Sequence, residues 1–220
     1  ILSEYSSSST EIQSVILQVA SDSDIRVRRQ AALTLGTIIA PNENYQAKKD
    51  KVLLQIIKQD NHDRWSKLAV LSASTKNPSK LLMTLLDEDN LSNMVEFISQ
   101  LSTLVAIYDY SDVPKLISRV SNMSDNEIIN NVLNGLINGF EYQENEMNKS
   151  QKLAIARHLD LIENQGDMQV IKSSWRIRKA LSLQHPVNRE EIVDRALIIL
   201  MDMENTNANR LAALDLLADE

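Results

Sequence analysis

Residues 24–36 read DIRVRRQAALTLG and place apolar side chains at three- and four-residue steps. The apolar members are Val27, Ala31, Ala32 and Leu35, and the spacing continues to Ile39. This periodicity predicts one apolar face of an α-helix. Because the two alanines are small, another helix can approach them closely. We interpret the stretch as the second helix of a helical hairpin.

Related patterns return later in the chain. At an offset of 38 residues the matches are Asp22 with Asp60, Arg26 with Arg64, Val27 with Trp65, Ala31 with Ala69 and Leu33 with Leu71. At an offset of 181 residues, Arg210, Ala212, Ala213, Leu214 and Leu216 match Arg29, Ala31, Ala32, Leu33 and Leu35. A period of roughly 40 residues with two helices per unit is typical of HEAT and armadillo repeats. The sequence therefore predicts an all-α fold, an α-solenoid of HEAT/armadillo-like helical hairpins forming an α-α superhelix. Because they occupy matching positions of the repeated second helix, Ala31, Leu35, Ala69 and Leu71 are expected to be buried between hairpins.

The rest of the chain divides into helical segments separated by short breaks. Residues 1–9 contain a run of serines and are predicted to be a linker, and residues 10–220 are predicted to form the repeat domain. About twelve helices are expected, near residues 10–20, 24–40, 44–60, 64–74, 77–86, 91–107, 111–120, 124–140, 149–163, 168–183, 189–203 and 207–218. Thr10 with Gln13 and Ser124 with Glu127 match capping boxes. Because the last residues stop inside a helical pattern, we expect the chain to be a fragment of a larger protein.

Composition excludes several classes of function. The 220 residues carry a net charge of −7, which disfavours binding to nucleic acid. Cysteine is absent, so a disulfide framework, a thiolate metal site and a cysteine nucleophile are all excluded. No apolar run reaches the 18 or more residues of a membrane span, and we expect no membrane insertion by this segment.

We find no catalytic, cofactor-binding or metal-binding constellation in the sequence. His62, His158 and His185 lie in three different segments without ligand spacing, so surface or turn positions are the expected reading. Gly135 and Gly139 lie four residues apart within one predicted helix, where they would permit close helix packing. The chain is therefore predicted not to be an enzyme and to hold no cofactor.

Two basic clusters allow alternative interpretations. They consist of Arg26, Arg28 and Arg29, and of Arg176, Arg178 and Lys179. On the concave face of a HEAT-like DNA glycosylase such residues would neutralise phosphates. Acidic residues surround both clusters here, and we expect Arg28 to pair with a turn aspartate of its own or the adjacent repeat.

The environment of two further sets of side chains can be interpreted in two ways. Asn130, Asn134 and Asn138 share one helical face, which would either line a binding groove or, as we expect, be solvated. Trp65 and Trp175 each follow or precede an arginine, so a cation–π contact is an option, and burial in the repeat core is the expected reading.

The order of the motifs resembles a known family. VRRQAALTLGTI is followed by LLQIIKQDNHDRWSKLAVLSAS, LLMTLL, VEFISQLSTLVAIYDYSDVPKLISRV, NNVLNGLINGFE and NRLAALDLLA. This order is similar to the HEAT-repeat segment of large bacterial, planctomycete-type membrane-bound dehydrogenases and c-type haem-binding multidomain proteins. The resemblance covers most of residues 12–218 and is most specific in residues 27–86. It implies a parent that is redox-active and exported or periplasmic. The family's haem would be held by a C-x-x-C-H motif, which this chain lacks, so no haem ligand carries over.

Two main functional hypotheses follow. In the first, the segment is a non-catalytic scaffold or docking module that positions a dehydrogenase domain, so its partners are neighbouring domains of the parent chain. In the second, it is a free-standing HEAT-repeat adaptor that binds a protein or peptide. A base-excision enzyme of HEAT-like fold is a third class. The sequence flanking the segment would separate them, since a downstream C-x-x-C-H and an upstream β-rich domain would favour the first.

Overall fold

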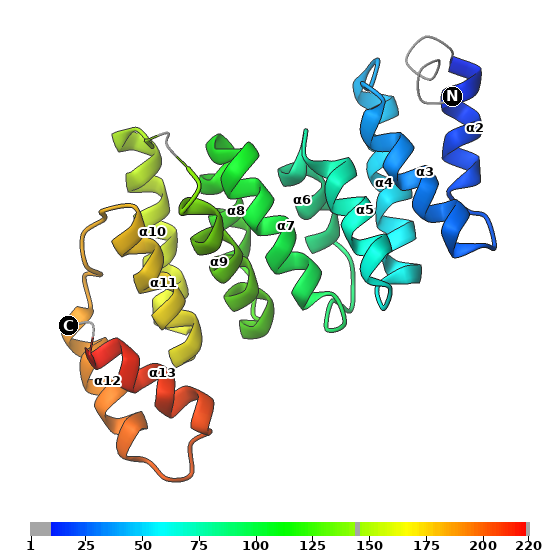
Figure 1. The fold of residues 1–220 in the computed structure, drawn as a ribbon. Helices are drawn as coiled ribbons and strands as arrows, with labels where there is room; N and C mark the ends of the chain where they lie inside the picture. Colours follow the sequence, from blue (N-terminus) through cyan, green and yellow to red (C-terminus); the bar gives the residue numbers. More distant parts are fainter. Residues whose placement is uncertain (1–9, 144–145, 219–220) are drawn as a thin grey trace. The chain divides into compact units, whose positions relative to one another are not determined.

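A computed structural model describes residues 10–143 and 146–218 of the chain (Figure 1). These residues form twelve α-helices and one short 3₁₀ helix, and they contain no strand. The predicted all-α class and the expected number of helices are therefore confirmed. The predicted linker, residues 1–9, and the side chain of Thr10 in the first predicted capping box lie outside the described part.

The helices follow one another with short connections. Their bounds are α2 Thr10–Val19, α3 Ile25–Thr37, α4 Glu43–Asp60, α5 Arg64–Ser74, α6 Pro78–Leu86, α7 Val95–Tyr108, η1 Tyr110–Asp112, α8 Val113–Val120, α9 Asn126–Phe140, α10 Lys149–Gln165, α11 Met168–Ala180, α12 Arg189–Met201 and α13 Asn207–Ala218.

The chain divides into two compact units, residues 1–104 and 105–220. In the first unit, α3 and α5 pack side by side and make the most extensive helix–helix contact (Figure 1). Helices α2, α4 and α6 form a second row, in which each contacts the next. Each α-helix of one row is thus connected through a short turn to a helix of the other.

The second unit repeats this arrangement in part. Helix α11 packs against α9 on one side and against α13 on the other, while α8 contacts α10. Helix α12 precedes α13 in the chain and packs mainly against it. The helices that contact each other most are therefore second neighbours in sequence, as well as the partners of one hairpin.

Aspartate and asparagine side chains fix where many helices begin. Asp24 accepts a hydrogen bond from the backbone N–H of Arg26 at 2.8 Å, and Asp63 accepts one from Ser66 at 2.7 Å. Each carboxylate satisfies an amide that has no partner within the helix. At α9 this residue is Asp125, which caps Glu127 and Ile128, and not Ser124 as the capping-box pattern predicted.

The three- and four-residue spacing of apolar side chains predicts burial in α3 only up to the residue where that helix ends. Ala31, Ala32 and Leu35 are buried, as predicted, but α3 ends at Thr37. Because the backbone is extended at Ile38, that residue turns inward, and Ile39 is 72% exposed. The prediction that Ile39 continues the apolar face is wrong for this reason.

Two residues of α5 that are predicted to lie in the core are more exposed than expected. Trp65 is 62% exposed, and Leu71 is only half-buried, whereas Ala69 is buried as predicted and Val70 is buried in addition. Helix α5 presents alanine and valine to its neighbours, because a tryptophan would hold adjacent helices apart. The prediction that Trp65 belongs to the core is wrong.

The match at an offset of 181 residues extends to burial. Ala212, Ala213 and Leu216 of α13 are buried, as are Ala31, Ala32 and Leu35 of α3. The intervening leucines, Leu33 and Leu214, are both exposed. The two helices, which lie in different units, therefore bury the same positions of a shared sequence pattern.

Gly36 shows how closely α3 and α5 approach. A Cβ atom at Gly36 would lie 2.9 Å from the Cα atom of Ala73 and 3.3 Å from its Cβ atom. Backbone cannot move aside as a flexible side chain can, so any residue other than glycine would force the two helices apart.

A buried ion pair connects the same pair of hairpins. The Arg28 guanidinium of α3 donates from Nε to Asp60 Oδ2 at 2.8 Å and from Nη2 to Asp60 Oδ1 at 2.5 Å. It also donates to the backbone carbonyls of Asp22 and Ser23 at 2.7 and 3.0 Å. The bond to Asp60 raises the pKa of Arg28. The predicted pairing of Arg28 with a turn aspartate is confirmed, and the partner belongs to the next hairpin.

We expect Leu35→Ala to lower the free energy of unfolding by about 2–5 kcal/mol, the range for truncating a fully buried leucine. The exposed change Lys48→Ala should alter it by no more than about 0.5 kcal/mol. Urea denaturation followed by circular dichroism measures both. A neutral Leu35→Ala would show that α3 does not pack in this register.

Lys49 generates a prediction about pH. The residue is buried, and burial together with the nearby charge of Lys76 lowers the pKa of its ammonium group to about 8. Because the unfolded chain binds the proton more tightly, folding stability should rise as the pH increases from about 8 to 10.5. Lys49→Met should stabilise the protein by about 1–3 kcal/mol at pH 7, and the gain should shrink over that pH range. A gain that is independent of pH would contradict this cause.

Candidate binding pocket on helix α11

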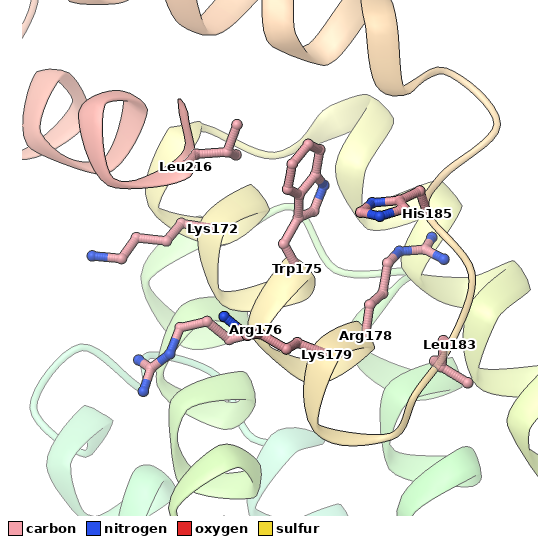
Figure 2. A pocket seen from close by; sticks show the side chains of 8 residues that line it. All are labelled: Lys172, Trp175, Arg176, Arg178, Lys179, Leu183, His185 and Leu216. Atoms are coloured by element: carbon pink, nitrogen blue, oxygen red, sulfur yellow. The ribbon is translucent and has the colours of Figure 1, made fainter. Parts of the chain in front are cut away.

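One pocket lies in the second unit, between α11, the loop that follows it and α13. We call it the α11 pocket (Figure 2), and its volume is about 280 Å³. Its lining comes from the three segments just mentioned. The lining residues are Lys172, Trp175, Arg176, Arg178, Lys179, Leu183, His185 and Leu216.

The end of α11 brings Leu183 and His185 to the pocket. Ser182 adopts a positive φ of 51°, the N–H of Leu183 donates to the carbonyl of Arg178 at 2.8 Å, and the N–H of Ser182 donates to Lys179 at 3.2 Å. These bonds are the Schellman arrangement, which turns the chain back beside the last helical turn. Helix α11 therefore ends at Ala180, earlier than the predicted Leu183, and the loop folds over it.

Arg178 forms the buried side of the pocket. Its Nε and Nη2 atoms donate to the two oxygens of Glu163 at 2.8 Å each, and Nη2 also donates to Asp160 at 2.6 Å. A fourth bond, from Nη1 to the carbonyl of Gln184 at 2.9 Å, holds the loop next to His185. Arg178 thus joins α10, α11 and the loop. Despite this pairing, burial raises the pKa of Glu163.

Trp175 is the aromatic side chain of the pocket. It is partly buried and packs against the core of α11, α12 and α13, which includes Ile171 and Leu216. Figure 2 shows its ring between Leu216 and His185, with the indole nitrogen on the side of His185. The Trp175 and His185 rings contact each other edge to face, with their centroids 6.1 Å apart. The indole N–H is shielded from solvent and has no hydrogen-bond partner in the described part of the chain.

The pocket is basic in a chain that is acidic overall. Five of its eight lining residues carry a basic side chain if His185 is included, and none is acidic. Two of these cations are already engaged, because Lys172 pairs with Asp215 of α13 and Arg178 pairs with Glu163. Arg176 is exposed and has no ion-pair partner among the described residues. Arg176 is therefore the cation best placed to meet an anion from solution.

The basic clusters of the sequence are divided by these contacts. Arg26 pairs with Asp24 at 2.6 Å and Arg29 with Asp63 at 3.3 Å, in addition to the buried pair of Arg28. In the second cluster Arg178 turns inward while Arg176 remains at the surface. The two clusters therefore do not form continuous basic patches of three side chains.

The three histidines occupy unlike environments. His62 is exposed, His158 has Nδ1 at 3.1 Å from the hydroxyl oxygen of Ser121, and His185 lies in the α11 pocket. Within the described residues, no group of three or more His, Asp or Glu side chains is placed to hold a metal ion.

The asparagine face of α9 is largely an interhelical contact. Asn130 Oδ1 accepts hydrogen bonds from Ser173 of α11 at 2.7 Å and from Asn134 at 3.1 Å, and both asparagines are half-buried. Only Asn138 is exposed. The prediction of a solvated face is wrong for Asn130 and Asn134, because a serine on the neighbouring helix provides a polar partner that one helix alone does not reveal.

A second hollow, of about 500 Å³, lies between α2 and α3 in the first unit. Val15 and Val19 line it, and its charged members Asp24 and Arg26 already pair with each other. It offers mainly apolar area without an uncommitted charge. We therefore regard the α11 pocket as the candidate site.

Comparison of the chain with protein-family models, with curated proteins and with solved structures returned no match. In the described residues, none of the helices combines the length and the apolar character needed to cross a membrane. The arguments for function therefore depend on the geometry given above.

We expect Arg178→Met to lower the free energy of unfolding by about 3–5 kcal/mol at pH 7, because it leaves the Glu163 carboxylate buried without its partner. The loss should decrease at lower pH, where Glu163 takes up a proton. Thermal or urea denaturation between pH 4 and pH 8 measures both effects.

The matched control is Arg157→Met, which removes an exposed arginine from α10 and should change stability by no more than about 0.5 kcal/mol. The double variant Arg178→Met with Glu163→Met should recover a large part of the stability lost in Arg178→Met. If Arg178→Met and Arg157→Met lowered the free energy of unfolding equally, the assigned role of Arg178 would be contradicted.

Proposed function

We propose that this chain is a HEAT-like helical-repeat scaffold that docks another protein or a neighbouring domain and catalyses no reaction itself. The observation that supports this most is the shared burial pattern of α3 and α13, with Ala31, Ala32 and Leu35 matched by Ala212, Ala213 and Leu216. Repeated hairpins bury their apolar faces against their neighbours and leave long surfaces for binding.

The packing of second neighbours supports a repeat array within each unit. Helices α3 and α5 are the second helices of successive hairpins, and α9, α11 and α13 are related in the same way. In a solenoid these helices form one row, and partners usually bind along such a row. The α11 pocket opens beside α11 and α13, so it lies on this row in the second unit.

The chemistry of the pocket favours binding over catalysis. A catalytic acid or base needs a partner at close range that receives or supplies its proton. The cations of the pocket are instead either paired with carboxylates or exposed to solvent. His185 contacts an indole ring, and the acidic groups next to the lining residues, those of Asp215, Glu163 and Asp160, are bound to Lys172 or Arg178. These contacts suit an anchor for a partner.

The identity of the partner separates two forms of the proposal. The resemblance in sequence order would make it a neighbouring dehydrogenase or haem domain of the same parent chain. A pocket of about 280 Å³ with both apolar and cationic walls also suits one or two side chains of a separate protein, which is the adaptor form.

Site-specific photocrosslinking in the native host tests the docking function. A photoreactive phenylalanine analogue is placed at Val187, which is 97% exposed and follows the lining residue His185 by two positions, at Leu214 on α13, or at the exposed Arg157 on α10 as control. We expect the same polypeptide, or the same neighbouring domain, to be captured from Val187 and Leu214 but not from Arg157. Absence of any polypeptide adduct at Val187 and Leu214 would contradict a docking role for this row of helices.

A further inference from the structure

The α11 pocket combines features that together define a ligand class. Its walls are cationic at Arg176 and Lys172 and apolar at Trp175, Leu183 and Leu216, and none of its lining residues is acidic. The carboxylates that lie next to these residues, those of Asp215, Glu163 and Asp160, are each paired with Lys172 or Arg178, so Arg176 contributes a positive charge that no described carboxylate balances.

We propose that the α11 pocket binds an acidic peptide segment, with one carboxylate beside Arg176 and an adjacent apolar side chain against Trp175 and Leu216. This inference rests on the proposed docking function and specifies what the docked partner presents. Arginine binds carboxylates through two parallel hydrogen bonds, which fixes direction as well as charge. The aromatic ring supplies most of the apolar contact area.

The volume and charge of the pocket favour a carboxylate over a phosphate. About 280 Å³ accommodates one or two side chains and is small for a nucleotide. Because Lys172 and Arg178 are already paired with Asp215 and Glu163, the uncommitted positive charge is lower than the composition suggests. A carboxylate with an apolar neighbour matches this modest charge and the apolar wall.

The unpaired N–H of Trp175 is consistent with this assignment. A shielded N–H donor without an acceptor destabilises the state in which it occurs, so an acceptor supplied by a ligand would be favourable. His185, which covers this edge of the indole, is itself exposed and lies in the loop after α11. A carboxylate or peptide carbonyl that replaces His185 at the ring edge would accept this hydrogen bond.

Fluorescence and calorimetric titration test the proposal. The variant Trp65→Phe leaves Trp175 as the only tryptophan of the chain, since the sequence contains two. It is titrated with the acetylated and amidated peptide Glu-Leu-Glu-Leu-Glu, with the neutral peptide Gln-Leu-Gln-Leu-Gln, and with inorganic phosphate. We expect a saturable change in Trp175 emission and a binding heat with the acidic peptide, and at least about tenfold weaker binding of the other two.

Two charge variants complete the test. Arg176→Gln, made in the Trp65→Phe background, should weaken the acidic peptide about tenfold, which corresponds to about 1.4 kcal/mol. Its thermal stability should be unchanged because Arg176 is exposed. The matched control Arg157→Gln should alter binding less than twofold.

Several results would overturn the inference. They are the absence of both heat and emission change with the acidic peptide, equal binding of the neutral peptide, equal or tighter binding of phosphate, or no effect of Arg176→Gln. If photocrosslinks from Val187 and Leu214 are still obtained in that case, the docking function stands and only the assigned ligand class is wrong.

Discussion

The close approach of α3 to α5 is the constraint on which the first unit depends. At Gly36 the two backbones come so near that a Cβ atom would lie 2.9 Å from Ala73. Alanines at positions 31, 32, 69 and 73 keep the rest of this interface thin. A small residue loses little side-chain entropy on burial, and the short distance lets dispersion contacts form along both helices. The large apolar side chains, among them Leu53, Ile56 and Ile57 of α4, then fill the space between the two rows of helices.

Buried arginines hold helices together at two places, once between two hairpins and once within one hairpin, and this determines what remains at the surface. Arg28 joins α3 to the end of α4 through Asp60, and Arg178 joins α11 to α10 through Glu163. Each arginine forms hydrogen bonds to backbone carbonyls as well, so most of its donors are satisfied. Removing one partner of such a pair is costly, because the other is left charged and buried. Since Arg178 is used in this way, Arg176 is the member of its cluster that can meet a ligand in the α11 pocket.

Much of the fold could be predicted from sequence, because helix periodicity and capping are local. The number of helices, the N-cap at Asp24 and the burial of Ala31, Leu35 and Ala69 follow from such local patterns. The candidate site could not be predicted, since it depends on contacts between distant segments. Ser182 ends α11 in a left-handed conformation that serine seldom adopts, and this turn brings His185 to Trp175. The partner of Asn130 is Ser173 on another helix, so a single helical face gave the wrong environment for it.

Native-state hydrogen exchange on Leu35→Ala tests the central claim, which is that each hairpin is stabilised mainly by its immediate neighbours. The account predicts that amide protection in residues 10–104 falls most in α3 itself and in α2, α4 and α5, which contact α3 directly. The loss should be clearly smaller in α6. The helices of residues 105–220 should keep their protection. An equal loss of protection in every helix from α2 to α6 would show that this unit unfolds as one globular core, and would contradict the repeat architecture.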